Sequence, residues 1–218
     1  MADMIPPVFS EQVRSSGERQ IFEKIKSEPG TDTWTCLHSL GLARHISQSY
    51  GEIDFVLLVP GEGIACLEVK SGQVSRKSGI WEYTGKYGRR VQDKRGPFNQ
   101  ASQAMHSLRT YVEQHLGQKG GLSSIFFTWA VVFPHCEFSK ADPAYEKWQI
   151  CDNKYREKPF SEFIQNLFNH SHEKSKGRNW YHPQRSRPSR KQIADLASFL
   201  RGDFEFCVKK GSAIKDLE

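Results

Sequence analysis

The sequence lacks the features of membrane, secreted and zinc-binding proteins. No apolar run approaches the roughly 20 residues that cross a bilayer. Residues 1–9 hold no basic stretch followed by an apolar one, as a secretory signal would. The five cysteines are scattered, odd in number and without a CxxC pair or zinc spacing, and Cys36 and Cys66 lie in apolar runs. We therefore expect a cytoplasmic protein with small buried thiols and no membrane partner.

Motifs of several enzyme classes are missing as well. The chain has no Gly-x-Ser-x-Gly, no P-loop and no dinucleotide-binding fingerprint. Gly61-Glu62-Gly63 is better explained as a hairpin turn than as a phosphate cradle. His170 and His172 are close in sequence, but they lie in a polar stretch without a third metal ligand nearby. The sequence therefore gives no support to serine hydrolases, nucleotide-binding enzymes or histidine metal sites.

The composition is that of a soluble globular protein. The chain has 218 residues, of which 37% are hydrophobic and 26% charged. This length fits one α/β domain with additional elements, or at most two small domains.

Positive charge is concentrated in two segments of the chain. The net charge is +6, whereas the sequence outside the two segments is net acidic. We expect a polyanionic partner, and the alternative is a pair of solvated loops. The first segment holds Lys86, Arg89, Arg90, Lys94 and Arg95, and the second holds Lys174, Lys176, Arg178, Arg185, Arg187, Arg190 and Lys191. We predict that Arg89, Arg90, Lys94 and Arg95 bind nucleic acid.

The hydrophobic periodicity predicts an α/β fold with a mixed β-sheet flanked by helices. Helices are expected from a capping box at Ser15 and Glu18 to residue 27, from Pro97 to about residue 116, and over 160–168 and 189–200. Strands are expected over 33–37, 53–59, 64–69, 125–133 and 148–151, with a polar hairpin around 80–83. Residues 170–190 are expected to form a basic loop, and residues 213–218 to begin another helix.

We expect two regions in this chain. Residues 13–150 form the main domain, and residues 151–218 form a helical and basic extension that connects it to a further module. The chain is then the N-terminal piece of a longer protein.

The two apolar strands at 53–59 and 64–69 bring charged residues together. If residues 60–62 form the loop of a hairpin, Val59 pairs with Gly63. The pairs that follow are Leu58 with Ile64, Val56 with Cys66, Asp54 with Glu68, and Glu52 with Lys70. This register puts two carboxylates side by side, with Cβ atoms roughly 5 Å apart, and places Lys70 on the same face as Glu68.

Adjacent carboxylates at the end of an apolar hairpin repel each other and require compensation. A hard divalent cation supplies it, and Mg²⁺ is often held by one or two carboxylates together with substrate phosphate. Such a metal can polarise a phosphodiester and activate water, and Lys70 can stabilise the developing negative charge. The alternative is a solvent-facing strand end at which Glu52 and Lys70 form an exposed ion pair.

Two residues from neighbouring helices complete the candidate cluster. Glu18 can be the acceptor of a capping box, but Ile21, Phe22 and Ile25 place it on the core-facing side of its helix. It is therefore also a candidate ligand for the metal or for water. Gln100 lies in the first turn of the long helix, where it either contacts substrate or serves ordinary capping.

Four segments in order carry a resemblance to a known family. They are Gly17-Glu18 in a helix, Gly51-Glu52-Ile53-Asp54 and Leu67-Glu68-Val69-Lys70 in consecutive strands, and Pro97-x-x-Gln100 at a helix start. Together, over residues 13–134, they resemble the NERD (nuclease-related) domain. That family is similar to the PD-(D/E)xK nucleases with their restriction-endonuclease-like core.

The resemblance implies hydrolysis of phosphodiester bonds in DNA with Mg²⁺, or alternatively Mn²⁺. It implies that Asp54, Glu68 and the main-chain carbonyl of Val69 hold the metal, that Lys70 is catalytic, and that Glu18 and Gln100 are accessory. It also implies a bacterial protein linked to a helicase, in some cases for phage defence. The competing hypotheses are a nucleic-acid-binding module without cleavage activity and an interaction domain whose charged cluster is only surface.

Overall fold

A six-stranded mixed β-sheet forms the centre of the protein. The computed structural model describes residues 1–202 except 12, 14, 43–50, 86–87 and 117–118. The strand order is β1-β2-β3-β4-β8-β9. The bounds are Asp3–Ile5 (β1), Thr35–Leu42 (β2), Gly51–Val59 (β3), Gly63–Val69 (β4), Phe127–Phe133 (β8) and Ile150–Asp152 (β9). β2, β3 and β4 are antiparallel, whereas β1 is parallel to β2, and β4, β8 and β9 are parallel to one another.

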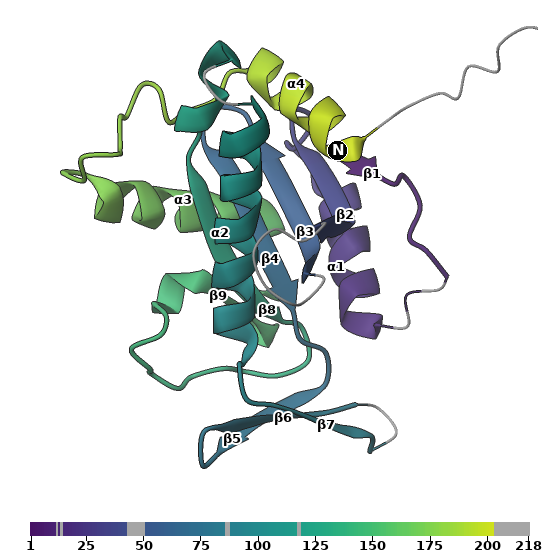
Figure 1. The fold of residues 1–218 in the computed structure, drawn as a ribbon. Coiled ribbons are helices and arrows are strands. Elements are labelled where there is room, and N and C mark those ends of the chain that lie inside the picture. Colours follow the sequence, from purple (N-terminus) through teal and green to yellow (C-terminus); the bar gives the residue numbers. More distant parts are fainter. Residues whose placement is uncertain (12, 14, 43–50, 86–87, 117–118, 203–218) are drawn as a thin grey trace, which may run out of the picture.

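Helices cover both faces of this sheet (Figure 1). On one face, α1 (Ser16–Ser27) and α3 (Phe160–Ser175) pack against a core that includes Phe55 and Leu67. On the other face, α2 (Pro97–Leu116) and α4 (Arg190–Arg201) pack against Val56, Cys66 and their neighbours. Successive side chains of β3 and β4 point to opposite faces of the sheet, so both strands contribute apolar residues to both cores. The predicted mixed sheet flanked by helices is confirmed.

A second, smaller sheet projects beyond the end of the large one (Figure 1). It is antiparallel and consists of β5 (Gln73–Lys77), β6 (Ile80–Thr84) and β7 (Arg90–Asp93). Trp81 of β6 is buried against Phe98 in the first turn of α2, with ring centroids 5.7 Å apart. The expected polar hairpin is therefore part of a three-stranded sheet that several contacts anchor to the main domain, among them this aromatic pair and the 2.6 Å ion pair of Arg76 with Asp142.

The C-terminal part of the chain differs from the sequence prediction. Residues 170–175 were expected in a loop, but they continue α3, and His172 is buried. Both α3 and α4 pack on the large sheet, so residues after 151 share its two cores. Short 3-10 helices lie at Lys119–Ser124, Lys147–Gln149 and Asn153–Tyr155. The helix predicted to begin at residue 213 lies outside the described residues. None of the described helices is long and apolar enough to cross a membrane.

Candidate active site

The β3–β4 hairpin has the predicted register at its turn but a different arrangement at its open end. The pairs Val59–Gly63, Leu58–Ile64 and Val56–Cys66 are formed as predicted, and the described backbone pairing ends at Phe55–Leu67. Backbone pairs of Asp54 with Glu68 and of Glu52 with Lys70 are not among the described ones. Instead, the main-chain N–H of Val69 donates a 2.7 Å hydrogen bond to Oδ2 of Asp54.

The same strand end joins Glu68 to Lys70. Nζ of Lys70 lies 2.5 Å from Oε1 of Glu68, and the two side chains are 22% and 10% exposed. Lys70 therefore neutralises Glu68 rather than Glu52, which lies exposed on β3. The exposed ion pair between Glu52 and Lys70, which was the alternative from the sequence, is not what these residues form.

The carboxylates of this cluster are held in an unfavourable electrostatic environment. Burial and the charges of Glu68 and Glu18 raise the pKa of Asp54 well above its ordinary value, against the opposing effects of the Val69 N–H and Lys70. Burial also raises the pKa of Glu68, although Lys70 opposes the shift. A cation placed between them would relieve this repulsion, and carboxylate oxygens suit Mg²⁺ or Mn²⁺.

The donor set for such a cation is small. Within the described residues, no group of three or more His, Cys, Asp and Glu side chains is arranged to hold a metal ion. A metal at this point would rest on Asp54, Glu68 and the carbonyl of Val69, with water and phosphate as its other ligands. That arrangement is usual for Mg²⁺, which keeps several waters.

Glu18 reaches the cluster from the N-terminal turn of α1. The N-cap Ser15 accepts a hydrogen bond from the Glu18 N–H at 3.3 Å, as predicted. The Glu18 carboxylate lies 3.4 Å from Nε2 of the buried His38, and its charge raises the pKa of both Asp54 and Glu68. Of the predicted capping box, the Ser15 half is therefore confirmed, whereas the described contacts of the Glu18 carboxylate are with His38 and the carboxylates of the sheet.

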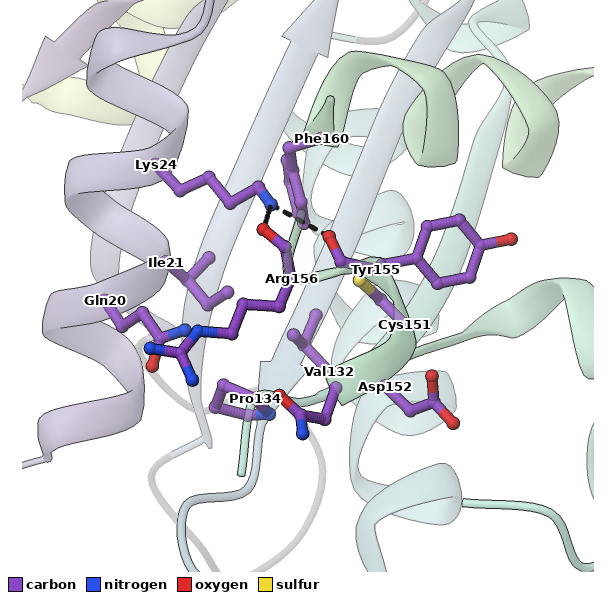
Figure 2. A pocket seen from close by; sticks show the side chains of 11 residues that line it. Gln20, Ile21, Lys24, Val132, Pro134, Cys151, Asp152, Tyr155, Arg156 and Phe160 are labelled. Carbon is purple, nitrogen blue, oxygen red and sulfur yellow. Dashed lines mark hydrogen bonds between the residues drawn. The ribbon is translucent and has the colours of Figure 1, made fainter. Parts of the chain in front are cut away.

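The position of α1 is fixed by close contacts at both ends. Near its start, the N–H of Gly17 donates to Oγ of Ser71 at 2.9 Å, and a Cβ at Gly17 would lie only 2.3 Å from that oxygen. Near its end, Nζ of Lys24 donates to the carbonyls of Tyr155 and Arg156 at 2.9 and 2.7 Å (Figure 2). The hollow between these contacts measures about 20 Å³, which is room for one water. These contacts hold Glu18 at a defined place beside β3 and β4.

Gln100 is held by the small sheet rather than by the carboxylates of the large one. Its Nε2 donates a 2.6 Å hydrogen bond to Oδ2 of Asp93, and its Oε1 is buried without a hydrogen-bond partner among the described residues. A contact of Gln100 with water or substrate therefore stays a prediction.

Tyr83 of β6 is a neighbour of the cluster that the sequence reasoning missed. Nζ of Lys70 lies 5.4 Å from the centroid of its ring. Its hydroxyl is buried without a hydrogen-bond partner among the described residues, and burial together with the charges of Asp93 and Glu68 raises its pKa. Tyr83 follows Trp81 by two residues on one strand, so the alternation of side chains was the signal that could have indicated an inward orientation.

The predicted nucleic-acid-binding residues Arg89, Arg90, Lys94 and Arg95 are exposed on and around β7. Arg90 lies 3.8 Å from Glu82 on the neighbouring strand. The charge of Arg95 lowers the pKa of Glu68, so this guanidinium lies within electrostatic reach of the cluster. The small sheet therefore presents positive charge beside the carboxylates.

Comparison with known proteins identifies the family. The family model described as nuclease-related domain, NERD, matches residues 14–134, which is more than half of the chain and includes all the residues of the cluster. Comparisons with curated proteins and with solved structures found no match. The sequence resemblance is thereby confirmed, and the chain belongs to the NERD family of nuclease-related domains.

Proposed function

We propose that this protein is a metal-dependent nuclease that hydrolyses phosphodiester bonds in DNA. The observation that carries the proposal is the convergence of Asp54 and Glu68, two carboxylates whose mutual repulsion calls for a cation, with Lys70 at 2.5 Å from one of them. Membership of a nuclease-related family supports the same chemistry.

In this proposal each residue has a separate role. Asp54, Glu68 and the carbonyl of Val69 would hold Mg²⁺, or Mn²⁺ in its place. When bound, the ion would supply Lewis acidity toward the phosphate and activate water. Lys70 exchanges its contact with Glu68 for the attacking water or the phosphate oxygen, where its charge stabilises the transition state. Glu18 and Gln100 orient water and substrate.

The substrate is drawn to the site by the basic residues of the small sheet. Arg89, Arg90, Lys94 and Arg95 bind the phosphates of the nucleic acid, which adds an electrostatic and salt-dependent contribution to affinity. We also propose, from the family resemblance, a bacterial cytoplasmic setting in which a helicase delivers the DNA, in some cases in phage defence.

Cleavage assays with site variants test the proposal. Labelled single-stranded and duplex DNA, and RNA of the same sequence, are incubated with the protein in Mg²⁺, Mn²⁺ or chelator. We expect Asp54→Ala, Glu68→Ala and Lys70→Ala to abolish metal-dependent cleavage of DNA while the circular dichroism spectrum is retained. The exposed Glu52→Ala is the matched control, since it removes a carboxylate from the same strand end. Undiminished cleavage by all three site variants would contradict the proposal.

A binding module without cleavage is the second candidate. It is favoured by the ion pair of Lys70 with Glu68, because an ammonium group at 2.5 Å neutralises one carboxylate without a metal. A salt-dependent gel shift without cleavage in Mg²⁺ or Mn²⁺, and without a metal-induced rise in Tm, would establish this function instead.

A further inference from the structure

The central part of the second basic segment forms an ordered loop between α3 and α4, whereas Lys174 lies in α3, and Arg190 and Lys191 lie in α4. The Tyr181 N–H donates to the carbonyl of Arg178 at 3.0 Å, and the Ser186 N–H donates to the carbonyl of His182 at 2.8 Å, so the loop contains two tight turns. Tyr181 and Ser186 are buried, and Ser186 accepts a bond from the main chain of Phe126 at 2.9 Å. The loop is therefore a fixed surface rather than a solvated tail.

Part of the positive charge in this segment is already neutralised. Lys174 contacts Glu146, Lys176 lies 2.5 Å from Glu173, and Arg187 lies 2.7 Å from Glu62. Arg178 and Arg185 are exposed and form no ion pair with any described residue. The two turns of the loop thus each present one arginine that has no acidic partner in the described chain.

Trp180 lies between these two arginines in the sequence. This residue is 48% exposed, and it is the one aromatic residue among the large hydrophobic residues that are exposed in the described chain. Its ring is nearly parallel to that of Phe126, at 6.3 Å and 15°, and the guanidinium of Arg109 on α2 lies 5.1 Å from its centroid. These contacts fix the orientation of the indole and leave about half of it open.

We propose that the Trp180 surface, consisting of Arg178, Trp180 and Arg185, binds a single strand of nucleic acid, with a base stacked on Trp180 and phosphates on the two arginines. Arg109 only orients the indole, because its guanidinium is already paired with Glu113 at 2.7 Å. Aromatic stacking combined with a positive track is the usual basis for binding single strands. A ring that is already oriented loses little rotamer freedom on binding, which favours stacking.

Other partners fit this surface less well. The bases of a duplex are stacked on each other and are not available to an exposed indole, so the aromatic element would be unused. A membrane surface calls for several exposed apolar residues at the same depth, whereas Trp180 is the one large hydrophobic residue exposed in its loop and its neighbour Tyr181 is buried. An acidic peptide would satisfy the arginines but supplies no base to stack.

One helix, α2, carries both Arg109, which contacts Trp180, and Gln100, which is part of the candidate active site. Gln100 is in the first turn of α2, and Arg109 follows nine residues later, which corresponds to about 14 Å along the helix axis. The inference rests on the proposed function for its polyanionic partner, but the Trp180 surface is separate from the residues that would cleave. It assigns to the nuclease a binding track for an unpaired strand beside α2.

Binding measured in chelator tests this inference independently of cleavage. Fluorescence anisotropy is recorded with labelled oligothymidylate, with oligouridylate and with a duplex of the same length, and heparin serves as a polyanion without bases. We expect Trp180→Ala to weaken binding of the single strands by roughly 5- to 150-fold, whereas Trp180→Phe retains most of the affinity and heparin binding is unchanged. The oligothymidylate and oligouridylate measurements distinguish DNA from RNA.

The arginines give a second and separate readout. Arg178→Ala and Arg185→Ala together should reduce the slope of log K against log salt by about 0.7 for each phosphate contact that is lost. Lys140→Ala with Lys147→Ala is the matched control, because it removes two exposed positive charges elsewhere and should leave the slope nearly unchanged.

Several results would overturn the inference. Among them are wild-type affinity for single strands in a folded Trp180→Ala protein, an equal loss for heparin, and an equal effect of the lysine control. Loss of binding to anionic phosphatidylserine vesicles, with oligonucleotide binding intact, would assign Trp180 to a membrane surface instead. If cleavage is absent but the Trp180 effect is present, only the proposed nuclease function fails.

Discussion

The two ends of the β3–β4 hairpin each hold carboxylates with little exposure, but their environments are opposite. At the turn, Glu62 receives hydrogen bonds from Arg187 at 2.7 Å and Gln165 at 3.1 Å, and His172 lies 3.5 Å away. Burial alone would raise the pKa of Glu62, but the bonds from His172 and Gln165 and the charge of Arg187 outweigh it and lower the pKa. The charge at the turn is therefore stabilised by the fold.

At the open end the balance is reversed. Asp54 and Glu68 lie close to each other and to Glu18, and the pKa values of Asp54 and Glu68 are raised. Lys70, the Val69 main-chain N–H and the charge of Arg95 compensate only in part. The comparison separates a charge network that the fold stabilises from a cluster that the fold compensates only in part, and perturbed pKa values of this kind are common at functional sites.

The largest expected effect is on the cleavage rate, when one carboxylate charge is removed at the open end of the β3–β4 hairpin rather than at its turn. Glu68→Gln should lower the cleavage rate by about 10²- to 10³-fold or more, because a proposed metal ligand is lost. Glu62→Gln should leave the rate within about threefold and lower the free energy of unfolding by about 1–2 kcal/mol, since a charged acceptor is lost from a partly exposed network. Rate and urea denaturation are measured on both proteins. The distinction fails if both variants lose activity equally.

A second prediction concerns the contact that positions Glu18. Gly17→Ala places a Cβ 2.3 Å from Ser71 Oγ and 2.9 Å from a Pro134 side-chain carbon, so either α1 or these two side chains must shift. We expect a loss of about 1–3 kcal/mol in stability, as for other overpacked sites, and a fall in cleavage rate of roughly tenfold or more. Ser16→Ala, at the neighbouring position of the helix, is the control. An unchanged rate would show that Glu18 has no role in positioning.

Tyr83 offers a smaller test at the open end. Tyr83→Phe removes a hydroxyl that has no partner among the described residues, so it should leave the Tm unchanged or slightly higher. If the hydroxyl donates to substrate or water, kcat should fall roughly tenfold with little change in KM. A loss of Tm with normal kcat would make Tyr83 a structural residue only.

The smallest predicted effect is a change in the pH dependence of stability, measured in chelator. Its sign is opposite for variants at the open end and at the turn of the β3–β4 hairpin. The folded-state pKa of Asp54 is raised above 3.8, so its charge destabilises the fold near neutral pH and the penalty disappears as the pH falls. Asp54→Asn should therefore raise the Tm at neutral pH by a few degrees, and the gain should shrink in acid.

The pKa of Glu62 is lowered below 4.5, so its stabilisation is present above that pH and is lost as the pH falls through the lowered value. Glu62→Gln should be less stable than wild type at neutral pH, with the difference vanishing in acid. Thermal denaturation across pH checks both variants. Two differences of the same sign would contradict the comparison.

The sequence was sufficient where structure depends on local patterns. The β3–β4 turn pairs Val59 with Gly63 as predicted, because alternation and turn residues determine a short hairpin. The long helix was expected from Pro97 to about residue 116, and α2 spans Pro97–Leu116, because its buried stripe has helical period.

The missed features depend on residues far away in the chain. The sequence at the end of α3 has no apolar stripe, because its buried residues are Ser171, His172 and Ser175. The Ser171 hydroxyl is hydrogen-bonded to the hydroxyl of Thr128, a residue of β8, at 2.7 Å. The three-residue strand β1 forms through its pairing with β2. For Tyr83 and His38, only the folded structure brings the ring beside Lys70 and the imidazole beside Glu18.

The bond from the Val69 N–H to the Asp54 carboxylate has a consequence for the register of the sheet. The backbone pairing of β3 with β4 ends at Phe55 and Leu67. Beyond that pair, the Asp54 side chain accepts the hydrogen bond of the Val69 N–H and so continues to join the two strands. A slip of one residue would turn Glu68 to the opposite face of β4 and break this hydrogen bond. Asp54, which we propose as a metal ligand, thus also stabilises the register of β3 with β4.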